Sequence, residues 1–127
     1  MSAKILIVDD EIDVCKAISR FLEKNDFTAV MANSGEEALA KISEEKPNLI
    51  LLDIRMPDMD GVECLRKIRE QDKKVTVIMV TCVTDIGTAK KALELGAIDY
   101  ITKPISLEAL QTAITTYLFL KKDEMVQ

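Results

Sequence analysis

Short apolar runs alternate along the chain with segments in which apolar residues recur every three or four positions. Five runs are rich in Ile, Leu and Val: Ile5–Val8, Phe27–Met31, Leu49–Leu52, Val75–Val80 and Ile98–Ile101. Such runs are typical of strands in a parallel sheet that is covered on both faces. The segments after them show helical spacing, as Val14, Ile18 and Leu22 do after the first run. The pattern predicts five strands, each followed by a helix.

Several predicted helix ends coincide with residues that cap helices well. Ser34 and Asp60 each precede a predicted helix and are followed three residues later by glutamate, which is a capping-box pattern. Ser106 is a good N-cap for the last helix. Asn25 and Gly96 stand where a left-handed residue commonly ends a helix. These residues support the helices that the apolar spacing predicts.

The predicted elements form one α/β domain of the (βα)5 type. Alternating strands and helices with short connections imply right-handed crossovers and a doubly wound, five-stranded parallel sheet. We take its strand order as 2-1-3-4-5, the order of flavodoxin-like sheets. The length of 127 residues suits a single domain. We place this domain at residues 1–121 and interpret the charged segment 122–127 as a tail or the start of a linker.

Composition narrows the functions to expect. Hydrophobic residues make up 48% of the chain and charged residues 31%, as in a globular domain. The net charge is −5 and the basic residues are scattered, so we expect no direct binding to nucleic acid. The three cysteines show no CxxC spacing, which argues against a zinc site and a disulfide framework. Because the sequence shows no signal peptide and no membrane-length apolar run, we expect a cytoplasmic protein with no membrane contact.

Polar residues stand at the ends of four of the five predicted strands. Asp9 and Asp10 follow the first strand, Asp53 the third, Thr81 the fourth and Lys103 the fifth. The carboxyl ends of parallel strands lie at one edge of the sheet, and sites form there where the strand order reverses. In the order 2-1-3-4-5 this point lies between the first and third strands. We therefore expect the three aspartates to converge.

Three carboxylates packed together repel one another unless a cation lies between them. Mg²⁺ suits such a site, because it binds oxygen ligands and typically uses one or two protein carboxylates. One carboxylate is then free to act as a nucleophile, and aspartyl phosphate is a known covalent intermediate. Lys103 and Thr81 would stabilise charge on a transferring phosphoryl group. The residues indicate phosphoryl transfer to aspartate, with Mg²⁺ as the cofactor and Mn²⁺ as an alternative.

Four motifs resemble the receiver domain of bacterial two-component response regulators. They are ILIVDDE (Ile5–Glu11), LLDIRMPDMDG (Leu51–Gly61), VTC (Val80–Cys82) and GAIDYITKPI (Gly96–Ile105). Each motif is weak alone, but their combination in this order is highly specific, and the resemblance covers nearly the whole chain. It implies a CheY-like fold and a phosphorylated switch. Such a switch is not an enzyme beyond its own phosphorylation and dephosphorylation.

The resemblance assigns roles to the residues around the predicted phosphoacceptor. Asp53 would accept the phosphoryl group, and Lys103 would contact it. Asp10 would bind the metal directly and Asp9 mainly through water, while Asp53 and the backbone carbonyl of Arg55 would complete the protein ligands.

The resemblance also implies how the switch responds and what it contacts. Thr81 would move to hydrogen-bond the phosphoryl group, and Tyr100 would then turn inward. The donor would be a sensor histidine kinase or a histidine phosphotransfer protein. The face of the fourth helix, fifth strand and fifth helix would meet an output domain or target protein, or form a dimer on phosphorylation. The Lys103–Pro104 peptide bond is expected to be cis.

Two residues near the predicted site bear on how long the phosphoryl group lasts. Val83 offers no group that could orient an attacking water, and Arg55 can reach over the phosphoryl group. We therefore expect slow self-dephosphorylation. The alternative is that Arg55 points to solvent or pairs with Glu11, which leaves the site open.

Other functions remain to be weighed against this one. The acid pair alone would most often cap a helix. A flavodoxin-like nucleotide or flavin binder needs a Gly-rich or Ser/Thr-rich loop after the first strand, where this chain has Asp9-Asp10-Glu11. A haloacid-dehalogenase-type phosphatase needs a D-x-D arrangement there. A receiver-like interaction module that works without phosphorylation is the remaining alternative, although such modules usually lack one of the site residues.

Overall fold

The computed structural model describes residues 2–126, with side chains as far as Lys121. Strands and helices alternate along the chain, in the predicted (βα)5 order. A short 3-10 turn, η1, precedes the fourth helix. The elements are β1 (Lys4–Val8), α1 (Ile12–Lys24), β2 (Thr28–Ala32), α2 (Gly35–Glu45), β3 (Leu49–Asp53), α3 (Gly61–Gln71), β4 (Thr76–Thr81), η1 (Val83–Asp85), α4 (Ile86–Glu94), β5 (Asp99–Thr102) and α5 (Leu107–Val126).

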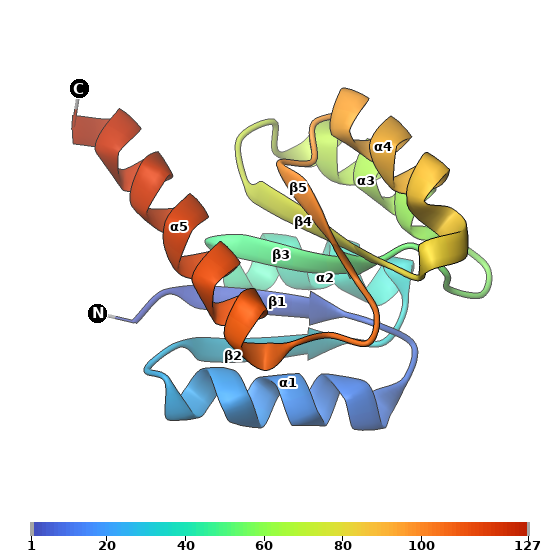
Figure 1. Cartoon of the computed structure of the whole chain (residues 1–127). Coiled ribbons are helices and arrows are strands. Elements are labelled where there is room, and N and C mark those ends of the chain that lie inside the picture. Colours follow the sequence, from blue (N-terminus) through green and yellow to red (C-terminus); the bar gives the residue numbers. More distant parts are fainter. Residues whose placement is uncertain (1, 127) are drawn as a thin grey trace.

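The five strands form one parallel sheet in the order β2-β1-β3-β4-β5, which confirms the predicted topology. Helices α1 and α5 cover one face, and α2, α3 and α4 cover the other (Figure 1). Each face has its own core because successive side chains of a strand point to opposite sides. In β1, Leu6 packs toward α2 and α3, whereas Ile5 packs toward α1 and α5.

Three strands, β2, β4 and β5, are shifted by one residue from the prediction. β2 begins at Thr28 because the N–H of Phe27 donates to the carbonyl of Leu22, 3.0 Å away, and so belongs to the turn after α1. β5 begins at Asp99 and not at Ile98, which is 51% exposed. β4 begins at Thr76 because the N–H of Val75 donates to the side chain of Asp72, 3.0 Å away.

The predicted helix caps are largely confirmed. Ser34, Asp60 and Ser106 each accept a hydrogen bond from the backbone N–H three residues on. Gly96 has the expected left-handed backbone, with φ +107°. The prediction for Asn25 is wrong by one residue. Asn25 has φ −108°, and its side chain donates to the carbonyl of Phe21, so the left-handed position falls on Asp26 with φ 69°.

The C-terminal helix is longer than the sequence suggested. α5 continues to Val126, so most of the segment interpreted as a tail is helical, and residue 127 lies outside the described residues. Where the domain ends remains a prediction. No helix in the described part of the chain is long and apolar enough to cross a membrane.

Candidate functional site

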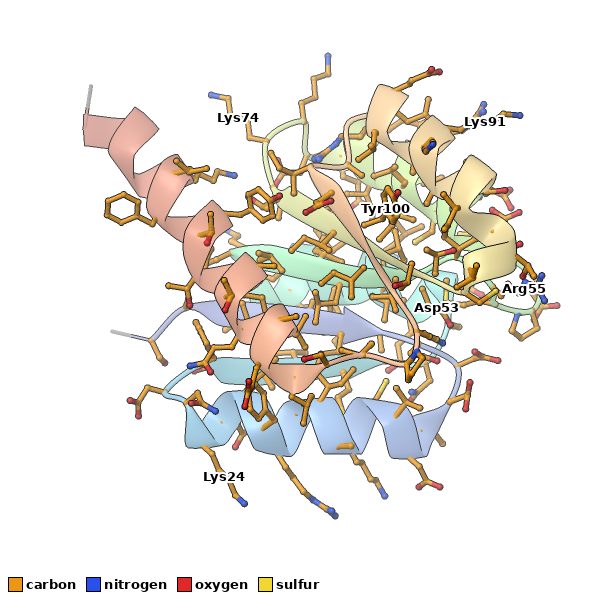
Figure 2. The ribbon with its side chains drawn as sticks, in the orientation of Figure 1. Lys24, Asp53, Arg55, Lys74, Lys91 and Tyr100 are labelled. Carbon is orange, nitrogen blue, oxygen red and sulfur yellow. The ribbon has the colours of Figure 1, made fainter. Side chains whose placement is uncertain are left out.

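The carboxyl edge of the sheet brings the predicted polar residues together. Asp53 is the last residue of β3 and Thr81 the last of β4. Asp9 follows β1 directly, and Lys103 follows β5. Because β1, β3, β4 and β5 are neighbours and parallel, their ends place these side chains side by side. Figure 2 shows Asp53 at this edge, with Arg55 just beyond it.

The three aspartates converge as predicted. One carboxylate oxygen from each of Asp9, Asp10 and Asp53 lies within 4.8 Å of the other two. Asp9 and Asp53 are only 3% and 4% exposed, whereas Asp10 is exposed. Asp9 also accepts a hydrogen bond from the backbone N–H of Glu11, at 2.9 Å. Two carboxylates are thus buried beside each other at the end of the sheet.

Lys103 is the cation nearest to the two buried carboxylates. Its Nζ lies 3.3 Å from Oδ2 of Asp53 and 3.5 Å from Oδ2 of Asp9. The backbone N–H of Lys103 donates to the carbonyl of Thr81 at 2.7 Å, which fixes the start of the β5–α5 connection against β4. The Lys103–Pro104 peptide bond is cis, as predicted.

One lysine does not offset the negative charge of this cluster. Burial and the charge of Asp9 together raise the pKa of Asp53 to about 6, against the opposing effect of Lys103. Burial disfavours the charged form of Lys103, but the charges of Asp53 and Asp9 outweigh it and raise the pKa of Lys103 above its ordinary value. The cluster therefore keeps an excess of negative charge, which a further cation would neutralise.

The arrangement of oxygen atoms fits a divalent cation. Opposite ligands of Mg²⁺ lie about 4 Å apart, since each ligand bond is about 2.0–2.1 Å long. The three carboxylate oxygens lie within 4.8 Å of one another, so small shifts of the side chains would bring them to this spacing. Carboxylate oxygen is also the ligand that Mg²⁺ prefers. The donor set thus suits Mg²⁺ and is unlike a zinc site built from His and Cys.

A cavity of about 280 Å³ opens onto Asp53 at this edge. Asp10, Thr81 and Lys103 also line it, and among the described residues Asp9 does not. A molecule that enters the cavity can therefore reach Asp53, whereas Asp9 does not border the cavity.

Thr81 and Tyr100 occupy the predicted places, but the structure does not test their roles as a switch. Thr81 is buried, and its Oγ1 donates to the carbonyl of Cys82 at 3.1 Å. Tyr100 is half-buried against the core on the side of α4 (Figure 2). The two residues belong to the adjacent strands β4 and β5.

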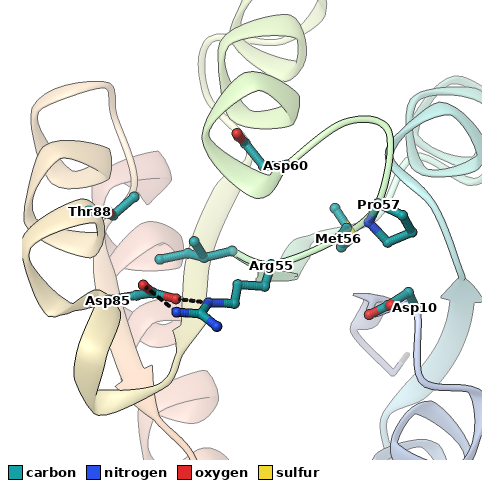
Figure 3. A pocket seen from close by; sticks show the side chains of 8 residues that line it. Asp10, Arg55, Met56, Pro57, Asp60, Asp85 and Thr88 are labelled. Atoms are coloured by element: carbon teal, nitrogen blue, oxygen red, sulfur yellow. Dashed lines mark hydrogen bonds and ion pairs between the residues drawn. The ribbon is translucent and has the colours of Figure 1, made fainter.

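Arg55 does not reach over Asp53 as expected. Its side chain is 69% exposed, in line with the alternative that it points to solvent, but it pairs with Asp85 and not with Glu11. Its Nε lies 2.5 Å from Oδ2 of Asp85, and its Nη2 lies 3.1 Å from Oδ1 (Figure 3). Sequence reasoning missed Asp85. The strand order offered a clue. Because β3 and β4 are neighbours, the loops after them lie side by side, and Asp85 is an acid in the second of these loops.

Gly61, the first residue of α3, lies against the backbone of Asp53. A Cβ atom on Gly61 would lie 2.3 Å from the backbone carbonyl oxygen of Asp53. The N–H of Gly61 also donates to the carbonyl of Ile54, at 2.8 Å. A glycine is required because the start of α3 packs directly on the backbone of the predicted phosphoacceptor.

Comparison with known proteins agrees with this geometry. The family model of the response regulator receiver domain matches residues 5–115. This chain belongs to the response regulator receiver family. The receiver domain of Methanospirillum hungatei JF-1 has a crystal structure that superposes with a TM-score of 0.92 at 34% identity, over 98% of this chain and 99% of that one. The fold and the family are thus shown by independent comparisons.

The curated relatives of this receiver domain differ in length. Sporulation initiation phosphotransferase F of Bacillus subtilis is 32% identical over 123 residues, which are 97% of this chain and 99% of that protein. A protein-glutamate methylesterase/protein-glutamine glutaminase of Trichodesmium erythraeum is 44% identical over 115 residues, but these are only 33% of that protein. Several further relatives are likewise matched over half of their length or less. The activities of such longer proteins belong to them and do not transfer with the receiver domain.

Proposed function

We propose that this receiver domain is a signalling switch that is activated by phosphorylation of Asp53. The observation that carries the proposal is the placement of Lys103 Nζ 3.3 Å from a buried Asp53 carboxylate, within a cluster of three aspartates. A buried carboxylate with a raised pKa in a cavity is typical of a functional site.

Asp53 is the best nucleophile among the three aspartates. It lines the cavity, whereas Asp9 does not and already accepts a hydrogen bond from Glu11. Asp10 is exposed, and Lys103 makes its ion pairs with the other two aspartates. An oxygen of Asp53 would attack the phosphorus of a phosphohistidine, the P–N bond would break, and the imidazole would leave.

The residues around Asp53 would bind a metal and the transferred group. Asp9, Asp10, Asp53 and the backbone carbonyl of Arg55 would hold Mg²⁺, with Mn²⁺ as a substitute. When bound, the metal supplies positive charge for the phosphoryl oxygens. Lys103 would contact one of these oxygens from the side of β5, and Thr81 would donate its hydroxyl hydrogen to another.

The phosphoryl donor would be a sensor histidine kinase or a histidine phosphotransfer protein. The face of α4, β5 and α5 would transmit the signal. Tyr100 of β5 lies on this side of the sheet, next to α4 (Figure 2). This face would bind an output domain or a target protein, or a second phosphorylated copy. We assign the protein no enzymatic activity beyond its own phosphorylation and dephosphorylation, and no direct contact with nucleic acid.

The test is phosphorylation by acetyl phosphate with excess Mg²⁺, followed by intact mass measurement. The wild-type protein should gain one phosphoryl mass, and Asp53→Asn should gain none. Asp58→Asn is the matched control, because Asp58 is an exposed residue of the same loop with φ 69°, which Asn adopts readily. It should be labelled like the wild type. Equal labelling of Asp53→Asn would show a different acceptor, and no labelling of the wild type would favour the phosphorylation-independent interaction module.

A further inference from the structure

An ion pair joins the two loops that border the phosphoacceptor. Arg55 belongs to the loop after β3, and Asp85 ends the η1 turn after β4. The guanidinium donates to both carboxylate oxygens of Asp85, at 2.5 Å and 3.1 Å, and Nη2 also lies 3.4 Å from Oγ1 of Thr84. Figure 3 shows the side chain of Arg55 directed to Asp85, on the opposite side of the pocket from Asp10. Both residues line the cavity at Asp53, and both also line a second cavity of about 480 Å³. The pair therefore lies between the two cavities.

Asp85 stands at the N-cap of α4 but does not cap it. Its backbone has φ −109° and ψ 16°, and its side chain makes no hydrogen bond to the first turn of the helix. Ser34 and Asp60, in contrast, cap α2 and α3 with their side chains. The carboxylate of Asp85 is instead occupied by Arg55 and by Sγ of Cys82, 3.3 Å away. The N–H of Ile86, the first residue of α4, donates to the carbonyl of Val83 in the η1 turn. The N–H groups of the next residues receive no hydrogen bond from the side chain of Asp85, which is the acceptor that this residue type usually provides.

A phosphoryl group on Asp53 would compete with Asp85 for Arg55. Arg55 follows Asp53 by two residues, in the loop that begins directly after β3. Its pKa is raised first by the hydrogen bond and charge of Asp85, and also by the charge of Asp53. A phosphoryl group adds nearly two negative charges and three strong acceptor oxygens. A guanidinium binds such a group through two parallel hydrogen bonds, as it now binds the carboxylate.

We propose that Arg55 exchanges partners on phosphorylation, leaving Asp85 for the phosphoryl group, and that the released Asp85 then caps α4. This inference rests on the proposed function, because it needs the phosphoryl group on Asp53. Asp85 is a positioning residue in this scheme: it holds Arg55 away from the acceptor while the protein is unmodified. The exchange couples the site to α4, because one carboxylate cannot bind Arg55 and cap the helix at once.

The exchange predicts opposite effects of its two partners on the phosphorylated state. In Asp85→Asn, Arg55 has no charged competitor, so the acyl phosphate should last about three- to fivefold longer in excess Mg²⁺, the range of an exposed ion pair. In Arg55→Gln it should be lost faster than in the wild type. In the double variant, Asp85→Asn should add nothing to Arg55→Gln, since its effect acts through Arg55. Glu94→Gln is the control. It removes the charge of an exposed residue of α4 and should leave the lifetime of the acyl phosphate unchanged.

Hydrogen exchange of the amides of Gly87 and Thr88 gives a second readout, which does not require phosphorylation. In unmodified Arg55→Gln, Asp85 is free to cap α4, so these amides should exchange about three- to tenfold more slowly than in the wild type. Phosphorylation of the wild type should slow them similarly. Unchanged exchange in unmodified Arg55→Gln, or unchanged lifetime in Asp85→Asn, would overturn the partner exchange. Failure of the wild type to gain a phosphoryl mass would overturn the proposed function instead, so the two failures are distinguishable.

Discussion

Two aspartates at opposite ends of the central sheet lie in contrasting surroundings. Asp53 ends β3 at the carboxyl edge, and Asp72 precedes β4 at the other edge. Oδ1 of Asp72 accepts hydrogen bonds from the backbone N–H groups of Lys74 and Val75, at 2.8 Å and 3.0 Å. Hydrogen bonding, with that of Lys74 foremost, lowers the pKa of Asp72, whereas burial beside Asp9 raises that of Asp53.

The difference shows where local structural rules are kept and where they are broken. At the amino edge Asp72 and its neighbour Arg69 are bonded to backbone groups of nearby loops. Arg69, for example, donates to the backbone carbonyls of Asp72 and Gly96. At the carboxyl edge, buried carboxylates exceed the cations available to them. A violation of this kind typically coincides with function, because the missing partner is a ligand or a transferred group.

The largest effect expected at the carboxyl edge comes from Gly61. Gly61→Ala should lower the free energy of unfolding by about 2–4 kcal/mol, because the new Cβ would clash with the backbone of Asp53. Gly87→Ala is the matched control, since no atom lies within 4 Å of its added Cβ, and it should raise stability by about 0.5–1 kcal/mol. Urea unfolding measures both. Equal stability of the two variants would mean that the start of α3 can move away from Asp53 at little cost.

Removing the charge of Asp53 and removing that of Asp72 should change the free energy of unfolding in opposite directions. Without metal, Asp53→Asn should raise the free energy of unfolding by about 1–2 kcal/mol, because the ionised form of Asp53 is disfavoured in the folded protein. Asp72→Asn should lower it by less than about 1 kcal/mol, since the amide still accepts hydrogen bonds but without charge. Urea unfolding at neutral pH with a chelator tests this. The same sign for both variants would remove the contrast between the two edges.

The stability of the metal-free protein should depend on pH through Asp53. Its pKa is about 6 in the folded protein against an ordinary value of 3.8, so the folded state keeps a proton that the unfolded state has lost. The stabilising contribution is full below the lower value and is lost as pH rises through 6. Between about pH 4 and pH 7 the wild type should lose about 1–2 kcal/mol more stability than Asp53→Asn. Parallel pH profiles for the two proteins would contradict the raised pKa.

A small effect is expected away from the site, at Tyr117. Its hydroxyl donates to Asp99 at 2.6 Å, and this hydrogen bond raises the pKa of Tyr117 to about 12. Tyr117→Phe should therefore lower stability by about 0.5–1 kcal/mol in urea unfolding. Asp99→Asn should bring the pKa of Tyr117 down toward its ordinary value in an ultraviolet titration. If that pKa stays near 12, the carboxylate of Asp99 is not its cause.

Much of the site could be predicted because its residues follow strand ends. Asp9, Asp53, Thr81 and Lys103 each stand at the end of an apolar run, and a parallel sheet brings such ends to one edge. The convergence of the three aspartates needed only the strand order in addition. The partner of Arg55 could not be predicted in this way. A long exposed side chain can reach several acids, and its choice depends on the positions of two loops.

The sequence by itself determined the strands and helices, the two-sided burial of the sheet and the edge at which the polar residues meet. These follow from apolar periodicity and capping residues, which act over a few neighbouring positions. Only the tertiary structure decided that Asp85 pairs with Arg55 and does not cap α4, and that Gly61 packs on the backbone of Asp53. These contacts join segments that are far apart or only loosely constrained along the chain. Their distances depend on how the helices pack against the sheet, and no local pattern encodes that packing.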